Sequence, residues 1–469
     1  MFCITLSANF YYMQKLVIKS QFMGVKPCEI ELRRFLLLIG EQASGKSTIA
    51  KLIYFFQTLP EAIYENALLT VEKKDARFDF VEHINKIARQ KFEDTFGWGF
   101  QHTPFELLYF YSPANFLKIT QPYKGRIFAE FEKDMGFSIG GYLKDYINTP
   151  RLKAATRSDE VLRRQQLQQG LDVCFHRLNS DYTYMIAGRT ATVAFSPVVE
   201  EKVADEIEKI VEDSVKQQDF ETKRRTGNEM LFIEFVDWSK DLRVFFNRNG
   251  KTFSSVGNRL ATEQNQQALN KLTEIASIIL KGEYRSETYE EYIKFSDKEP
   301  SIALKDASSG QQEVLRILQG LFLAVGLKNR REFFVVEEPE AHLYPLAQKE
   351  LINAFAVFLN AIKEGRLIIT THSPYILACV NILLLAHYVN KERGGNGIEK
   401  QISETAVPKD YWLDPADFSA YAIGHSDVYC RNIKDDVTGL VAENYLDSIS
   451  DDLGMKYNQL YNFLTLEGA

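Results

Sequence analysis

The chain has 469 residues, of which 45% are hydrophobic and 25% charged, a composition typical of a soluble globular protein with about two to three domains. The formal net charge of −7 argues against a uniformly basic nucleic-acid binder. The five cysteines lie far apart without a CxxC pair, which favours reduced thiols in a cytoplasm and argues against a zinc site; they are Cys3, Cys28, Cys174, Cys379 and Cys430.

Neither end of the chain predicts a targeting or membrane segment. The apolar start lacks the basic region and the full hydrophobic stretch of a signal peptide, and Met13 is an alternative natural start to Met1. The apolar run at residues 382–386 is far too short to cross a bilayer. We expect a soluble cytoplasmic protein without a membrane partner.

The first predicted elements are strands. Short runs at residues 15–18 and 29–32 lead to a fully apolar run at 35–39, which suits a strand buried on both faces. The pattern at residues 49–56 predicts a helix, and a strand pair is expected at residues 105–111 and 116–119.

The segment between the buried strand and this helix matches G-x-x-x-x-G-K-[ST] without a departure. Its glycines let backbone N–H groups turn toward phosphates, and the helix dipole favours negative charge there. Lys46 would neutralise the β- and γ-phosphates, and Ser47 would ligate Mg²⁺. The predicted site for ATP and Mg²⁺ comprises Gly40, Glu41, Gln42, Ala43, Ser44, Gly45, Lys46, Ser47 and Thr48.

Residues 121–300 predict a largely helical insertion. A Ser-Pro start and apolar spacings of three and four residues indicate a helix at residues 196–210. A second helix is expected at residues 262–280, and Gly282 is expected to end it. Neither pattern lasts long enough for a coiled coil.

The remaining elements predict an α/β architecture. A buried helix is expected at residues 314–325, and strands at 333–336 and 367–370; their alternation indicates a mostly parallel sheet covered on both faces. Strands at residues 418–423 and 428–433 and a closing helix form the tail. The predicted segments are an N-terminal part of an ATPase head with a β-subdomain (1–120), the insertion (121–300), a C-terminal part of the head (301–395) and an α+β tail (396–469).

The strand at residues 333–336 ends in two carboxylates, Glu337 and Glu338. A phosphate-loop enzyme places its metal-ordering acid and its catalytic base at such a strand end. We expect Glu337 to reach Mg²⁺ through water, and Glu338 to act as the general base that polarises the attacking water.

Two further segments carry a resemblance. Ser-Ser-Gly-Gln-Gln at residues 308–312 resembles the signature motif of the ATP-binding-cassette superfamily. Residues 339–343, together with the Thr-His-Ser-Pro segment at 371–374, resemble its non-transporter branch, which includes the structural-maintenance-of-chromosomes, RecF and OLD-type ATPases.

The resemblance implies a site shared between two copies of the chain. In that branch the signature contacts the γ-phosphate that the other subunit's phosphate loop holds. The residues that would complete the site in trans are Ser308 or Ser309, Gly310 and Gln311, and His372 would be the switch histidine that senses the γ-phosphate.

A compact ATPase of this branch looks like the AAA-type ATPases of bacterial anti-phage systems of the Septu and PARIS types. That resemblance implies self-association and control of a partner effector, often a nuclease on a second chain. OLD-type proteins carry a Toprim nuclease after the ATPase, whereas the nearest candidate here, Asp451-Asp452, has adjacent acids and follows no apolar strand. We predict no nuclease in this chain.

Two features depart from the family pattern. Glu337 stands where most families have aspartate, which would slow hydrolysis without preventing ATP binding, and no glutamine loop is evident. Residues 184–189 resemble a Tyr-Ile-Pro-Ala-Gly-Arg segment of the AAA-type ATPases of this branch. Arg189 is therefore expected either to approach the nucleotide or the dimer partner, or to be an ordinary surface arginine.

Rival functions stay open. Basic clusters at residues 151–153, 163–164 and 223–225 are typical of solvated helix faces, although they could contact DNA phosphates. A RecF-like DNA-repair ATPase that clamps DNA is the main alternative. A transporter subunit is disfavoured by the long insertion, and a phosphate-loop protein that never hydrolyses ATP is the remaining alternative.

Overall fold

A computed structural model covers the whole chain. It describes residues 13–69, 78–97, 103–123, 126–148, 157–176, 181–190, 227–287, 290–295, 300–327, 331–394, 397–424, 427–442 and 455–456. The predicted helix at residues 196–210 and nearly all of the expected closing helix lie outside these ranges.

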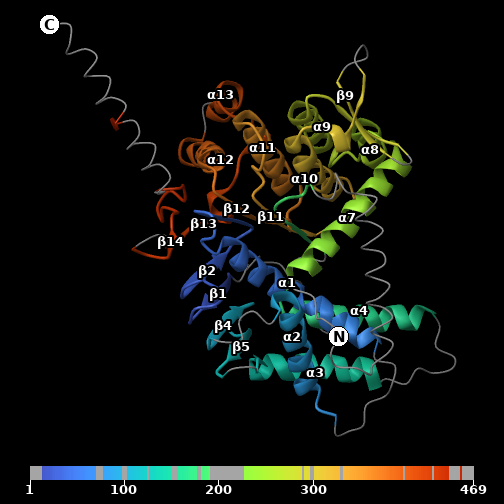
Figure 1. Cartoon of the computed structure of the whole chain (residues 1–469), viewed down its shortest axis with the longest axis vertical. Helices are drawn as coiled ribbons and strands as arrows, with labels where there is room; N and C mark the ends of the chain where they lie inside the picture. The colour runs from blue at the N-terminus through green and yellow to red at the C-terminus, as the bar shows by residue number, and fades with distance from the viewer. Residues whose placement is uncertain are drawn as a thin grey trace. The chain divides into compact units, whose positions relative to one another are not determined.

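The chain divides into two compact units, each assembled from separate stretches of sequence (Figure 1). The first comprises Met1–Arg33, Thr48–Tyr182 and Glu221–Leu231, and the second Arg34–Ser47, Thr183–Phe220 and Phe232–Ala469. Neither unit is continuous along the chain, and the division into four segments stays a prediction.

The first unit is built on a five-stranded sheet in the order β2-β1-β4-β5-β6, in which every neighbouring pair is antiparallel. Its strands are β1 (Gln14–Ile18), β2 (Cys28–Leu32), β4 (Phe105–Phe110), β5 (Phe116–Gln121) and β6 (Phe128–Phe131). Its helices are α2 (Phe80–Phe96), α3 (Lys133–Asn148) and α4 (Arg157–Cys174), together with most of α1 (Lys46–Leu69).

Aromatic side chains fill the core of the first unit. The ring of Phe22 lies 5.0 Å from that of Phe105 and 5.8 Å from that of Phe92, measured between centroids. Such pairs stabilise a core by about 0.5–1.5 kcal/mol beyond their buried area. The four strands predicted in this region are confirmed, and β6 is an addition.

The second unit holds a six-stranded sheet in the order β14-β13-β3-β12-β11-β7. Parallel pairs join β11 to β12, β12 to β3 and β3 to β13, and β14 pairs with β13 in the antiparallel direction. The strands are β3 (Phe35–Gly40), β7 (Asp181–Met185), β11 (Glu332–Glu337), β12 (Arg366–Thr371), β13 (Phe418–Ile423) and β14 (Cys430–Asn432). The predicted mostly parallel α/β head is confirmed.

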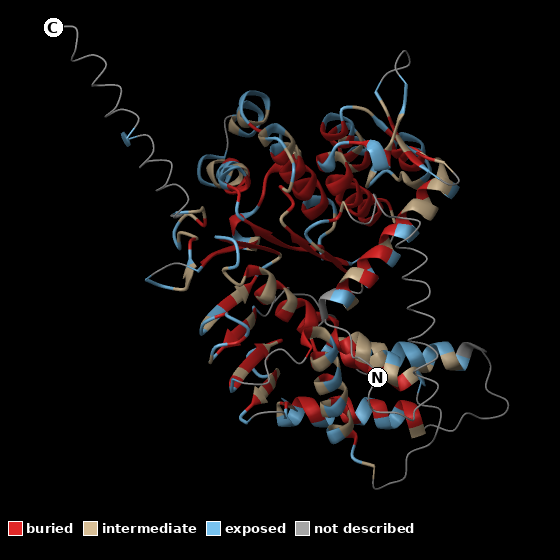
Figure 2. Ribbon diagram, viewed as in Figure 1, coloured by how far each residue is buried: buried red, intermediate tan, exposed pale blue. Residues whose placement is uncertain are grey.

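Every residue of β3, β11, β12 and β13 is buried, as Figure 2 shows by its red central strands. Figure 1 shows α9, α10, α11 and α12 together on one side of this sheet. The described helices of the unit are most of α7 (Gly227–Asn249) together with α8 (Phe253–Leu260), α9 (Gln266–Leu280), α10 (Ser309–Gly326), α11 (Pro345–Ala361), α12 (Pro374–Arg393) and α13 (Ile398–Thr405).

The predicted insertion at residues 121–300 contains strands as well as helices. β6 completes the sheet of the first unit, and β7 lies next to β11 at the edge of the central sheet. A small antiparallel sheet in the order β10-β9-β8 is formed by β8 (Glu283–Ser286), β9 (Glu291–Lys294) and β10 (Ile302–Ala303).

The helix predicted at residues 262–280 begins later, at Gln266. Asn265 accepts the backbone N–H of Thr262 at 2.6 Å, which makes a turn in front of the helix. The helix ends where Lys281 adopts a left-handed conformation before Gly282. None of the described helices combines the length and the apolar character needed to span a bilayer.

Candidate ATP site

The loop between β3 and α1 has a backbone suited to an anion. Gly45 has φ +97°, in the region that favours glycine, and Ala43 also has a positive φ of 62°. The first-turn N–H groups of α1 have no carbonyl acceptors within the helix. Lys46, Ser47 and Thr48 are the first three residues of α1, so the predicted residues from Gly40 to Thr48 form one strand–loop–helix unit.

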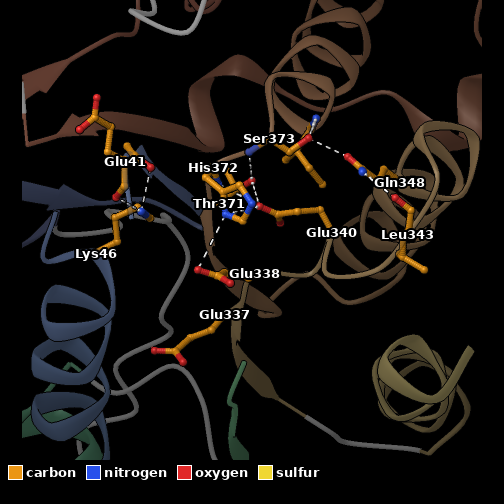
Figure 3. Close-up of polar contacts among 12 residues, drawn as sticks. Glu41, Lys46, Glu337, Glu338, Glu340, Leu343, Gln348, Thr371, His372 and Ser373 are labelled. Carbon is orange, nitrogen blue, oxygen red and sulfur yellow. Dashed lines mark hydrogen bonds and ion pairs between the residues drawn. The ribbon is translucent and has the colours of Figure 1, made fainter. Parts of the chain in front are cut away.

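The side chain of Lys46 is buried in this loop. Its ammonium donates to the carbonyl oxygens of Gly40 at 2.8 Å and Glu41 at 2.6 Å. Burial lowers the pKa of Lys46, while the nearby carboxylates of Glu338, Glu340 and Glu41 act in the opposite direction. A desolvated cation therefore lies at the mouth of the loop, close to the acids that follow β11 (Figure 3).

Residues of the C-terminal tail support the loop. β13 pairs in parallel with β3, and a Cβ placed on Gly40 would meet the carbonyl oxygen of Ile423 at only 2.2 Å. A Cβ on Gly424 would meet that of Ser44 at 2.6 Å. The Tyr429 hydroxyl donates to the Ser44 carbonyl at 2.7 Å. The sequence did not predict this support, because no local pattern reports the pairing of β13 with β3.

Glu337 ends β11 with a buried side chain that β7 and the residues directly after it hold. One carboxylate oxygen accepts the Tyr184 hydroxyl at 2.6 Å, and the other accepts the backbone N–H of Ala187 at 3.2 Å. The same hydroxyl lies 3.5 Å from the carbonyl oxygen of Ser47. The Tyr184 hydroxyl thus donates to the Glu337 carboxylate and lies near the backbone of Ser47, the other predicted metal ligand.

Glu338 directly follows the strand and has a positive φ of 42°. Its N–H donates to the Thr370 carbonyl at 2.8 Å, and its carboxylate is about one-third exposed, 3.8 Å from Nδ1 of His372. His372 is half-exposed, just before the N-terminus of α12. The predicted base and the predicted switch histidine are therefore neighbours.

A third carboxylate, that of Glu340, organises the histidine loop. It is buried, and its Oε1 accepts the Thr371 hydroxyl at 2.7 Å and the His372 N–H at 2.9 Å. Oε1 also lies 3.4 Å from Nδ1 of His372, whereas Oε2 has no hydrogen-bond partner among the described residues. No role is predicted for Glu340 from the sequence, although its position directly after Glu-Glu-Pro could have indicated a third acid at this site.

A chain of hydrogen bonds links the histidine loop to α11 (Figure 3). The Ser373 hydroxyl donates to Oε1 of Gln348 at 2.6 Å, and Nε2 of Gln348 donates to the Leu343 carbonyl at 2.9 Å. Leu343 ends the segment that follows Glu338. The loops after β11 and β12 are therefore fixed to each other.

Arg189 lies in the core, and the prediction of a surface arginine is wrong. Its side chain is fully buried, and its guanidinium donates to the backbone carbonyls of Glu337 at 2.7 Å, Glu338 at 3.1 Å and Glu313 at 3.1 Å. Burial lowers the pKa of Arg189, and the Glu313 carboxylate, 3.1 Å from Nε, acts most strongly against that effect. In this chain Arg189 fixes the backbone at the end of β11.

The signature segment begins α10 and satisfies its own polar groups. Ser308 and Ser309 are exposed, and Ser308 caps the helix in a reciprocal capping box with Gln311. Nε2 of Gln311 also donates to the Leu280 carbonyl at 2.7 Å. A Cβ on Gly310 would meet the backbone oxygen of His342 at 2.5 Å. Within the described ranges, no hydrogen bond or ion pair joins this segment to the phosphate loop.

The parallel sheet, with the phosphate loop after β3 and the acids after β11, defines a phosphate-loop ATPase head. The sequence profile of the AAA ATPase domain family matches residues 117–377, more than half of the 469 residues. The chain therefore belongs to the AAA ATPase domain family. The match begins after the phosphate loop and includes the signature, both strand-end glutamates and His372.

Solved structures give a distant likeness. One is described as the SmcHead bound to the C-winged helix domain of ScpA, with 14% identity over 78% of this chain and 92% of that chain and a TM-score of 0.35. Another is the SMC head domain from Thermotoga maritima, with 12% identity over the same shares and a TM-score of 0.31. At these values the likeness carries no conclusion about function. No curated protein matches the chain.

Proposed function

We propose that this AAA ATPase binds Mg²⁺-ATP at residues 40–48 and hydrolyses it with Glu338 as the general base. The observation that carries the proposal is the grouping of a buried lysine, two strand-end glutamates and a histidine around adjacent strands of one sheet. Lys46 follows β3, Glu337 and Glu338 stand at the end of β11, and His372 follows β12. Parallel neighbours bring these strand ends to the same edge.

The donor set suits the two ligands. The Lys46 ammonium and the first-turn N–H groups of α1 are the groups that hold phosphates elsewhere. The Ser47 hydroxyl and the Glu337 carboxylate are oxygen ligands of the kind that Mg²⁺ prefers, with Glu337 acting through water. Bound Mg²⁺ supplies neutralisation of the phosphate charge.

The general base must take a proton from water, and Glu338 has the exposure to do so. Its carboxylate is about one-third accessible, whereas those of Glu337 and Glu340 are buried. Arg189 holds the carbonyls on both sides of the Glu337–Glu338 junction, so the base is presented from a fixed backbone. His372 lies beside Glu338 and Glu340, and in this proposal it senses the γ-phosphate.

The complete site requires two copies of the chain in this proposal. Ser308 and Ser309 are exposed at the start of α10, where N–H groups and the helix dipole favour an anion. Each copy would offer this signature to the phosphate loop of the other, as in the family that the motif resembles.

The proposed biological role is control of a partner effector, such as a nuclease subunit, in anti-phage defence. It rests on the resemblance to Septu- and PARIS-type ATPases. A RecF-like DNA clamp is less favoured, since Arg163 and Arg164 both pair with Glu160. DNA binding that falls steeply with salt would favour the clamp.

The direct test is ATP binding by Lys46→Ala. Removing a buried, hydrogen-bonded charge is expected to weaken ATP affinity by about a hundredfold or more, measured with a fluorescent ATP analogue. Lys349→Ala is the matched control, because Lys349 is exposed on α11 and pairs with Glu350 at 3.5 Å. Normal ATP affinity in Lys46→Ala would overturn the assignment.

A further inference from the structure

The acid at the end of β11 is a glutamate, which has one more rotatable bond than an aspartate. A longer side chain loses more conformational freedom when it is fixed, so an acid of this kind needs external restraint to hold a metal in one place. Glu337 has that restraint. Its two oxygens accept from two different groups of the segment at residues 184–187.

The restraint leaves capacity for a metal-bound water. An ionised carboxylate offers about four acceptor positions, and the Tyr184 hydroxyl and the Ala187 N–H occupy one each. Hydrogen bonds to a charged acceptor are stronger than those between neutral groups. The carboxylate is thus oriented from one side and retains acceptor positions on both oxygens.

Tyr184 also reaches the second predicted metal ligand. Its hydroxyl lies 3.5 Å from the backbone oxygen of Ser47, so the phenol stands between the ends of β11 and the start of α1. A displacement of the phenol would change the position of Glu337 relative to Ser47.

The segment that carries Tyr184 is itself held firmly. Tyr184 and Met185 are buried in β7, next to β11 in the sheet. Beyond the turn at Gly188, the Arg189 N–H donates to the Glu313 carboxylate at 3.1 Å, and its guanidinium donates to the Glu337 carbonyl. The backbone that carries Tyr184 is therefore held by the sheet at β7 and by the Arg189 contacts after it.

We infer that Tyr184 is a positioning residue for the Mg²⁺ site, where its hydroxyl fixes the Glu337 carboxylate. The inference rests on the proposed function of the site. Tyr184 touches neither nucleotide nor metal in this account; it acts through Glu337.

The test is metal affinity in Tyr184→Phe, which keeps the ring and removes the hydroxyl. Loss of a hydrogen-bond partner that orients a metal ligand typically weakens metal binding by about ten- to a hundredfold. We expect that loss for Mn²⁺ binding, measured by electron paramagnetic resonance in the presence of a non-hydrolysable ATP analogue. Binding of the analogue without metal should stay unchanged, because Lys46 and the loop are intact.

Tyr284→Phe is the matched control. The Tyr284 hydroxyl donates to Glu291 at 2.6 Å, and both residues are buried in the same unit. This variant removes a tyrosine–glutamate hydrogen bond of the same length at another place, so it should reproduce any loss of thermal stability while leaving Mn²⁺ affinity unchanged.

Glu337→Asp sharpens the result. If the hydroxyl acts through the longer carboxylate, Tyr184→Phe should weaken Mn²⁺ binding far less in the Glu337→Asp background than in the natural chain. Equal effects in both backgrounds, or unchanged Mn²⁺ affinity in Tyr184→Phe, would overturn the inference. Failure of the proposed function is distinguished by Lys46→Ala, whose retained nucleotide binding would move the site elsewhere irrespective of Tyr184.

Discussion

Two regions of the second unit differ in how their polar groups are satisfied. The proposed catalytic region, which we call the catalytic edge and which comprises the phosphate loop, Glu337, Glu338 and His372, is connected by contacts among the start of α1, β7 and the segments at the ends of β11 and β12. The signature segment at residues 308–311 satisfies its polar groups through its own capping box and the Leu280 carbonyl. One region is assembled within a single chain, and the other presents exposed serines outward.

In the proposed function, the catalytic edge binds the nucleotide and the signature contacts a second copy of the chain. The catalytic edge holds a buried cation among several carboxylates, where low polarity strengthens each interaction. The polar groups of the signature are satisfied within the chain, because Gln311 accepts the Ser308 N–H and donates to the Leu280 carbonyl. In our proposal the first region prepares the nucleotide, and the second supplies groups to another copy.

The largest effect should come from blocking the exposed signature. Ser309→Arg places a long side chain where the partner's phosphates would lie, so we expect ATP hydrolysis to fall to background while ATP affinity is retained. Measurement of both quantities on the same preparation separates these outcomes.

A mixing experiment is the control for this prediction. Lys46→Ala has an intact signature and Ser309→Arg has an intact phosphate loop, so a mixed dimer contains one complete site. Hydrolysis should reappear when the two inactive variants are mixed. Normal ATP hydrolysis by Ser309→Arg alone, or an inactive mixture, would contradict the claim that the signature of one copy completes the ATP site of another.

A smaller effect on ATP turnover is expected from Arg189→Met, which removes the hydrogen bonds to the carbonyls of Glu337 and Glu338. Removing one partner of a buried ion pair typically destabilises a protein by about 3–5 kcal/mol, because the Glu313 carboxylate stays buried. Urea denaturation measures this loss, and a change below about 1 kcal/mol would contradict it.

Arg316→Met is the matched comparison for Arg189. Arg316 is also buried on α10 and pairs with Glu291 through both terminal nitrogens. Both variants should lose stability, but only Arg189→Met should lower turnover of the folded protein, because only Arg189 holds the carbonyls of Glu337 and Glu338.

Local motifs predicted the parts of the site that are continuous in sequence. The phosphate loop, the acids at the end of β11 and the histidine after β12 each follow a strand that contains a continuous apolar run, and such runs are recognisable without a structure. The mostly parallel sheet followed from their alternation with helices.

The supports of the site come from non-local pairing, which the sequence pattern does not report. Tyr184 belongs to an edge strand within a region that was predicted as mainly helical, and Tyr429 follows a strand that pairs with β3 from nearly 400 residues away. The sequence alone leaves Arg189 to the nucleotide, a partner or the surface. Its buried acceptors lie on α10 and β11, which are distant in the sequence, so no local pattern predicts its role.

The most direct test of the central claim is the molar mass of Glu338→Gln in solution, with and without Mg²⁺-ATP. Loss of the base should slow turnover roughly a hundred- to ten-thousandfold while the phosphate contacts stay, so the nucleotide-bound state accumulates. The account predicts that ATP raises the mass to at least twice the monomer value. This rise should disappear in the double variant that carries both Glu338→Gln and Ser309→Arg. A mass that stays at the monomer value with ATP bound would contradict a site completed by a second copy.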